Sequence, residues 1–144
     1  MMNIRRIEEQ DCQQDFTTGK ETFDFDPTGR RLDVRFYFER DRSGDYESYV
    51  RIINHEIVGI LCVRYQEDAL YLSRVGVKEG LERKGYGKQL MKHAVTTAIE
   101  YGYRKTRLEA QEEVIEFFEN IGYVVTRRYK EDWWGNSATM ELFW

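Results

Sequence analysis

The sequence predicts an α+β fold in which a mixed, mostly antiparallel sheet is flanked by helices. Two features lead to this prediction. Three apolar segments between Tyr46 and Val77 are separated by short polar turns, which is typical of an antiparallel meander. Beyond Val77 the apolar residues recur at helical spacing on both sides of one further strand. The chain has 144 residues, so we expect a single domain that spans residues 1–144.

The first half of the chain contains four expected strands. A short strand is expected around residues 3–7, and one or two helices with loops should follow it up to about Arg42. The next three strands are expected at residues 46–53, 57–65 and 69–77. Residues 57–65 are almost continuously apolar, which predicts a central strand that is buried on both faces.

Two helices are expected in the second half. The first covers about residues 85–101, where apolar residues recur at helical spacing, and Gly102 follows it as a left-handed cap. The second covers about residues 114–121 and ends at Gly122 in the same way. The remaining strands are expected at residues 105–110, 123–128 and 138–143.

The composition excludes several classes of protein. Hydrophobic residues make up 41% of the chain and charged residues 33%, which is typical of a globular protein. The formal net charge of −4 gives no overall positive field, so no nucleic-acid partner is expected. No run approaches the about 18 apolar residues of a membrane span, and the N-terminal residues lack a signal-peptide core. We therefore expect no membrane partner.

The cysteines and histidines indicate a cytoplasmic protein without a metal. Cys12 and Cys62 show no spacing that would pair them, which favours two reduced thiols. His55 and His93 are the only histidines, and there is no Cys-x-x-Cys pair, so we expect no metal site.

The most informative segment is VGVKEGLERKGYGKQLM, residues 75–91, where a strand leads through a glycine-rich loop into a helix. Gly85 and Gly87 allow a close approach to the backbone, and the free amides of the first helical turn favour an anion such as a pyrophosphate. The loop matches neither a Walker loop nor a Rossmann fingerprint. Taken alone, it is equally explained as a turn that caps a helix. The cations beside it are Arg83, Lys84 and Lys88.

Four motifs in order resemble the GNAT acetyltransferase family, over residues 47–144. ERKGYG (residues 82–87) is similar to the family's pyrophosphate-binding pattern Q/R-x-x-G-x-G/A, and LSRVGV (72–77) resembles the strand before it. EFFENIGY (116–123) resembles the late helix and glycine turn that is often written FYEKLGF. AQ (110–111), which leads directly into that helix, is similar to a subset of the family with a shortened loop.

The resemblance implies an N-acetyltransferase that uses acetyl-coenzyme A (acetyl-CoA) as its co-substrate. The strands at residues 69–77 and 105–110 should separate through a bulge, for which Gly76 is a candidate. The pantetheine arm should then lie in the gap and bond to Val75 and Val77. The cofactor-binding residues that the resemblance implies are Val75, Gly76, Val77, Arg83, Lys84, Gly85, Tyr86, Gly87, Lys88, Gln111 and Phe118.

Three positions depart from the family pattern. Glu82 replaces the usual Gln or Arg of the pyrophosphate motif, and we expect its carboxylate to turn away from the phosphates. Phe118 stands where the family commonly has a tyrosine that protonates the leaving thiolate, whereas Phe117 is expected in the core. Ser73 stands where a glutamate often serves as general base.

The remaining candidates for the catalytic base are Glu109 and Tyr71. Glu109 lies on the strand opposite the expected thioester, at a position where the family often carries an acid. It is equally explained as an exposed residue paired with Arg107 or Lys105. Asp68, Glu141 and a chain of waters are further alternatives.

Two functional hypotheses follow. The first is an active enzyme that acetylates a primary amine of a small molecule or peptide, and the second is a non-catalytic acyl-CoA-binding module. Several aromatic residues fall where the family's variable substrate-binding helices lie, although such residues more often belong to the core: Phe23, Phe25, Phe36, Tyr37 and Phe38. Trp133 and Trp134 are candidates for covering the acceptor site or for a homodimer contact.

Overall fold

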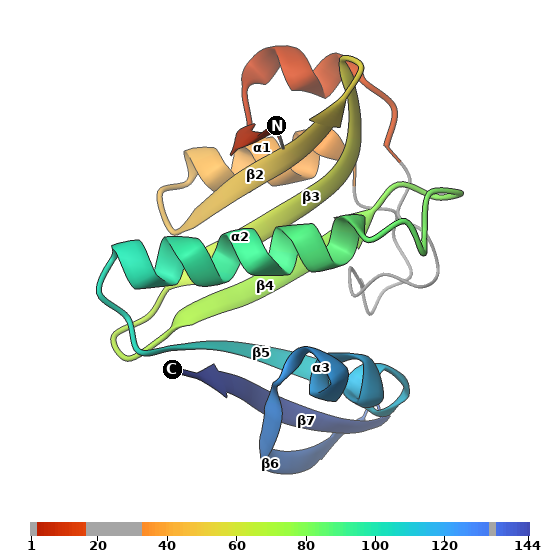
Figure 1. Ribbon diagram of the computed structural model, residues 1–144. Coiled ribbons are helices and arrows are strands. Elements are labelled where there is room, and N and C mark those ends of the chain that lie inside the picture. The colour runs from red at the N-terminus through yellow and green to blue at the C-terminus, as the bar shows by residue number, and fades with distance from the viewer. Residues whose placement is uncertain (1–2, 17–32, 133–134) are drawn as a thin grey trace.

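The computed structural model describes residues 3–16, 33–132 and 135–144, and Figure 1 shows how the elements are arranged. The strands are β1 (Asn3–Arg6), β2 (Tyr46–Ile53), β3 (Glu56–Tyr65), β4 (Leu70–Val77), β5 (Lys105–Gln111), β6 (Val124–Glu131) and β7 (Gly135–Phe143). The helices are α1 (Val34–Arg42), α2 (Tyr86–Glu100) and α3 (Ile115–Ile121), with short 3-10 helices η1 (Glu9–Gln13) and η2 (Glu112–Val114). Phe23, Phe25, Trp133 and Trp134 lie outside the described residues.

The strands form one seven-stranded sheet in the order β1-β2-β3-β4-β5-β7-β6. Neighbouring strands run antiparallel except β4 and β5, which are parallel and are connected through α2. The α+β fold with a mixed, mostly antiparallel sheet is therefore confirmed. Between β1 and β2 the structure describes η1 and α1, where one or two helices were expected.

Helices cover both faces of the sheet. On one face α2 and α3 pack over a core that includes Leu61 and Val63 of β3. On the other face α1 and η1 pack over a second core that includes Ile60 and Cys62 of the same strand. Alternate residues of a strand point to opposite faces, so β3 is buried on both faces, as its apolar sequence predicted.

The ends of α2 are set by two glycines in the left-handed region. Gly85 caps the start of α2 with a φ of 85°. Gly102 follows its C-terminal end, also with a φ of 85°, and Tyr103 N–H donates to the Ala98 carbonyl at 2.9 Å. Residues with a Cβ rarely adopt this backbone conformation, which is why glycine occupies both positions. Among the described residues, no helix is both long and apolar enough to cross a membrane.

Candidate functional site

The parallel pair β4–β5 is joined only at its beginning. Leu70 pairs with Thr106 and Tyr71 with Arg107, and no further pairs follow between these two strands. Each strand continues to pair on its other side, β4 with β3 as far as Val77 and β5 with β7 as far as Gln111. Figure 1 shows β4 and β5 diverging toward the end where α2 begins. The separation expected from the sequence is confirmed.

A β-bulge lies where the two strands begin to diverge. The register between β3 and β4 shifts there, because Cys62 pairs with Arg74 and Val63 with Leu72. Ser73 is therefore the extra residue of the bulge. Gly76 pairs regularly with Ile60, so its assignment as the bulge was wrong. A bulge bends its strand and increases the local twist, which turns the rest of β4 away from β5.

A pocket of about 500 Å³ lies beside the diverging end of β4 and the start of α2. Gly85, which precedes the first residue of α2, has no side chain that could accept a hydrogen bond from the amides of the first turn. These amides and the positive end of the helix dipole favour a bound anion. The lining residues are Val75, Val77, Leu81, Glu82, Arg83, Gly85, Tyr86, Gly87, Lys88 and Phe117.

The carboxylate of Glu109 is held by two hydroxyl groups on neighbouring strands. Tyr129 of β6 donates a hydrogen bond to Glu109 Oε1 at 2.8 Å, and Thr139 of β7 donates to the same oxygen at 2.7 Å. Thr139 lies directly opposite Glu109 in the β5–β7 register. Leu108 and Ala110 point into the core beneath α2 and α3, so Glu109 faces the opposite side of the sheet.

Tyr71 lies near Glu109 at the last pairing of β4 with β5. Burial, with the nearby Glu109 carboxylate, raises the pKa of Tyr71 to about 12, although Arg74 and Arg40 act to lower it. Near neutral pH the phenol is therefore protonated. It can donate a hydrogen bond but is unsuited to accept a proton from an ammonium ion.

A separate group of charges joins the beginning of β5 to β7 and to the β3–β4 turn. Arg107 contacts Asp68 at 2.6 Å and Glu141 at 2.9 Å, and Lys105 contacts Glu141 at 2.8 Å. The hydrogen bond from Arg107 lowers the pKa of Asp68. Burial alone would raise the pKa of Glu141, but hydrogen bonds from Lys105 and Arg107 lower it overall. Both carboxylates are therefore weak proton acceptors.

A comparison with protein families decides what kind of protein this is. The model of the acetyltransferase (GNAT) family matches residues 7–123. The chain belongs to the GNAT acetyltransferase family. A comparison with curated protein sequences found no significant match. GNAT enzymes are acyltransferases that take acetyl-CoA as their co-substrate.

Solved structures of GNAT proteins share the fold over almost the whole chain. Ard1 from Thermoplasma volcanium has a TM-score of 0.75 at 19% identity, covering 99% of this chain and 97% of its own. The ribosomal-protein-S18-alanine N-acetyltransferase from Escherichia coli has a TM-score of 0.76 at 16% identity, covering 99% and 94%. A GNAT family acetyltransferase from Elizabethkingia anophelis with acetyl-CoA bound has a TM-score of 0.71 at 13% identity, covering 99% and 98%.

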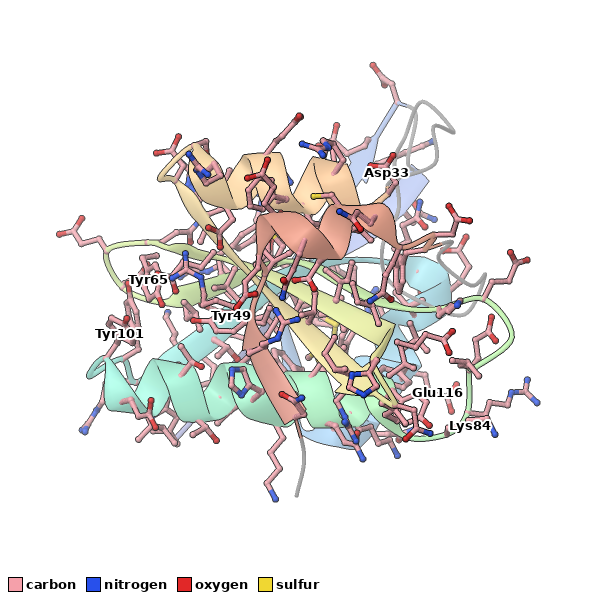
Figure 2. The ribbon with its side chains drawn as sticks, turned by 90° about the horizontal axis from the view of Figure 1, so that it is seen from above. Asp33, Tyr49, Tyr65, Lys84, Tyr101 and Glu116 are labelled. Atoms are coloured by element: carbon pink, nitrogen blue, oxygen red, sulfur yellow. The ribbon has the colours of Figure 1, made fainter. Side chains whose placement is uncertain are left out.

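Most residues that the resemblance assigned to the cofactor lie together in this GNAT chain. Those on the wall of the pocket are Val75, Val77, Arg83, Gly85, Tyr86, Gly87 and Lys88. Gly76, Lys84 and Gln111 are not among the lining residues. Figure 2 shows Lys84 at the outer edge of the loop before α2, and Gln111 ends β5. Glu82 is also among the residues that line the pocket.

The two adjacent phenylalanines of α3 differ in burial. Phe118 is 2% exposed and packs in the core against Tyr123, with ring centroids 5.8 Å apart. Phe117 lines the pocket. Ile115 and Phe118 share the buried side of this short helix, and one residue of helix rotates Phe117 about 100° away from it. The placement of Phe118 at the cofactor was therefore wrong, whereas Phe117 packs against the core, as expected, and also lines the pocket.

Several other expectations about side chains can now be corrected. Glu109 does not pair with Arg107 or Lys105, because both cations contact Asp68 and Glu141 instead. The sequence did not predict that Leu81 lines the pocket or that Tyr129 and Thr139 bind Glu109. The residues next to Tyr129 and Thr139 in the sequence give no sign that these side chains reach Glu109 on another strand. In α1, Tyr37 and Phe38 are buried in the core and Phe36 packs against it. Among the described residues, no group of three or more His, Cys, Asp or Glu side chains could hold a metal ion.

Proposed function

We propose that this GNAT chain is an active N-acetyltransferase, which transfers the acetyl group of acetyl-CoA to a primary amine. One observation carries the proposal: β4 and β5 separate directly beyond Tyr71, with a pocket on one side and the Glu109 carboxylate on the other. A thioester that enters the opening from the pocket reaches an amine held near Glu109. The reaction then needs no large movement of the backbone.

In this proposal, two parts of acetyl-CoA bind at different places beside the pocket. The pantetheine arm lies along the edge of β4 that β5 leaves unpaired and bonds to backbone groups of Val75, Gly76 and Val77. The pyrophosphate lies at the first turn of α2, against the amides of Gly85, Tyr86 and Gly87. Three cations add positive charge around it: Arg83, Lys84 and Lys88.

Glu109 acts as the general base in this proposal. Tyr129 and Thr139 both donate to Oε1, and none of the described residues donates to Oε2. Oε2 can therefore take a proton from the substrate ammonium, either directly or through one water. The neutral nitrogen attacks the thioester carbonyl, the carbon–sulfur bond breaks, and the nitrogen loses its second proton to solvent. The coenzyme A thiolate takes one proton from solvent, or from the Tyr71 phenol, which solvent then reprotonates. Gln111, two residues beyond Glu109, shares its face of β5 and borders the same space.

A thiol-release assay tests the proposal. Purified protein is incubated with acetyl-CoA and separate amines: a polyamine, an aminoglycoside, free amino acids and short peptides. We expect release of coenzyme A that depends on at least one amine. Glu109→Gln should lower kcat by about 10²-fold or more with unchanged affinity for acetyl-CoA. Glu112→Gln is the matched control, because Glu112 is exposed and only pairs with Arg128, and it should keep full activity.

The alternative is a non-catalytic acyl-CoA-binding module. The specific observations that favour it are Ser73 and Phe118, which remove a carboxylate and a phenol common in the family, and the burial of Phe118 in the core. Binding of acetyl-CoA seen as a thermal shift, with no release of thiol for any amine, would support the module and contradict the enzyme. We further propose a cytoplasmic location, where Cys12 and Cys62 would remain reduced, in keeping with a structure in which neither forms a disulfide.

A further inference from the structure

An arginine from α1 reaches the bulge of β4 on the acceptor side of the sheet. Arg40 Nη1 donates a hydrogen bond to Ser73 Oγ at 3.3 Å, although the two residues are 33 positions apart. Ser73 is the bulged residue at which β4 leaves β5. The half-buried guanidinium therefore lies beside the opening through which an acetyl group would meet its acceptor.

Aromatic rings hold Arg40 in place without neutralising its charge. The guanidinium lies 4.2 Å from the ring centroid of Tyr46 and 5.1 Å from that of Phe36. Within the described ranges, no carboxylate forms an ion pair with Arg40. By contrast, Arg6 and Arg107 each contact two carboxylates. Ring faces attract a cation but accept none of the N–H bonds in the guanidinium plane, so its remaining donors are available to a ligand.

Charges of both signs therefore lie near Tyr71, with Glu109 as the anion and Arg74 and Arg40 as the cations. Its phenol is within electrostatic reach of the Glu109 carboxylate from β5 and of the Arg40 guanidinium from α1. Glu109 suits an ammonium group, and Arg40 suits an anion that can accept two parallel N–H bonds, such as a carboxylate or a phosphate. A substrate that carries both groups close together would satisfy both side chains.

We propose that Arg40 binds an anionic group of the acceptor, so that the substrate is an amine with a carboxylate or phosphate near its nitrogen. This inference rests on the proposed acetyl transfer and specifies its substrate class. It also gives Ser73 a role, since a glutamate at that position would pair with Arg40 and occupy the anion site.

Matched pairs of amines test the proposal and distinguish the two anions. L-phenylalanine is compared with L-phenylalaninamide, and O-phosphoethanolamine with ethanolamine, by thiol release from acetyl-CoA. The amino group of L-phenylalaninamide is less basic than that of L-phenylalanine, so a larger fraction of it is unprotonated and able to attack near neutral pH. A higher kcat/KM for L-phenylalanine would therefore reflect recognition of its carboxylate. The variants are Arg40→Gln, Arg40→Lys, and Arg42→Gln as the control, because Arg42 lies two positions along the same helix over Phe38.

We expect kcat/KM for one anionic amine to exceed that of its neutral partner by about tenfold in the unaltered protein. Arg40→Gln should bring that ratio near one by slowing only the anionic amine. Arg40→Lys should keep part of the preference, and Arg42→Gln all of it. Equal use of both partners, or an equal loss for both in Arg40→Gln, would overturn the proposal.

Calorimetry of the complex with coenzyme A separates this inference from the proposed function. If no amine releases thiol, acetyl transfer to this panel fails, and binding of the same four probes decides the role of Arg40. The anionic probe must then bind more tightly than its neutral partner, and Arg40→Gln must remove the difference. Equal binding of both partners would refute the anion site.

Discussion

Gly87 and Gly85 provide a test of whether the α2 start binds a ligand or only begins a helix. A Cβ at Gly87 would meet only a Val77 side-chain carbon, at an ordinary 3.8 Å, so Gly87→Val should leave the fold intact. It should nevertheless abolish the thermal shift produced by millimolar acetyl-CoA, because the side chain fills the place of the pyrophosphate. In the unaltered protein, ligand at about 100 times its Kd should add about 2.7 kcal/mol to the free energy of unfolding.

Gly85→Ala is the contrasting variant. No atom lies within 4 Å of a Cβ built at Gly85, but its φ of 85° strains any residue with a side chain. We expect it to lower the free energy of unfolding by about 1–2 kcal/mol with or without ligand. A full thermal shift in Gly87→Val would show that the loop only caps the helix.

Phe118 and Phe117 separate a core position from a pocket position on one helix. Phe118→Tyr places a hydroxyl in the core, and we expect it to lower the free energy of unfolding by about 1–3 kcal/mol without increasing turnover. Phe117→Tyr, on the pocket wall, should leave that free energy within about 0.5 kcal/mol. Denaturant titration of both variants measures the difference. Faster turnover with unchanged stability in Phe118→Tyr would instead place its ring edge at the cofactor.

At the scale of elements, β4 has one paired edge and one edge that β5 leaves open beyond Tyr71. In an antiparallel strand, alternate residues bond to the same neighbour, so about half of the amides in residues 72–77 point toward this open edge. We expect these amides to exchange rapidly with deuterium in the free protein. Acetyl-CoA should slow their exchange, because the pantetheine arm takes the place of the missing strand.

Strand β2 is the internal control for this exchange measurement. It is paired with β1 on one side and β3 on the other, so its amides should be protected with and without ligand. Protection that spreads equally over β2 and β4 would indicate general stabilisation of the fold, and the pantetheine arm would then lie elsewhere.

At the scale of the whole molecule, the charges around Arg107 connect segments that are far apart in the chain. Arg107 and Lys105 of β5 contact Asp68 in the β3–β4 turn and Glu141 in β7. These contacts lie at the end of the strand pair where β4 and β5 remain joined. Their pairing stabilises the closed end of the strand pair, while the other end stays unpaired.

Acid should weaken this connection. The folded-state pKa values of Asp68 and Glu141 are lowered, so the unfolded chain binds protons first as the pH falls. The free energy of unfolding should therefore decrease as the pH drops below about 4, and the contribution is fully present at pH 7. Glu141→Gln should cost about 1–3 kcal/mol at pH 7 and make the loss in acid shallower. Urea denaturation at a series of pH values measures both effects, and an unchanged acid dependence would contradict this role.

The local pattern of the sequence determined the elements, their order and the position of the glycine-rich loop before α2. Apolar periodicity located the central strands and α2, because strand and helix periods depend on neighbouring residues alone. The glycines at residues 85 and 102 marked the start and end of α2, since only glycine adopts the required backbone easily. The family motifs, which are short and continuous, then predicted the separation of β4 and β5.

Only the tertiary structure decided which side chains meet. Glu109 is held by residues 20 and 30 positions away, and Ser73 by one 33 positions away. These contacts depend on strand order, register and the bulge in β4, and a shift of one residue would turn each side chain to the other face of the sheet. Phe117 and Phe118 illustrate the same limit within a helix. Two identical neighbours give no local signal, and packing against Tyr123 determines which of them is buried.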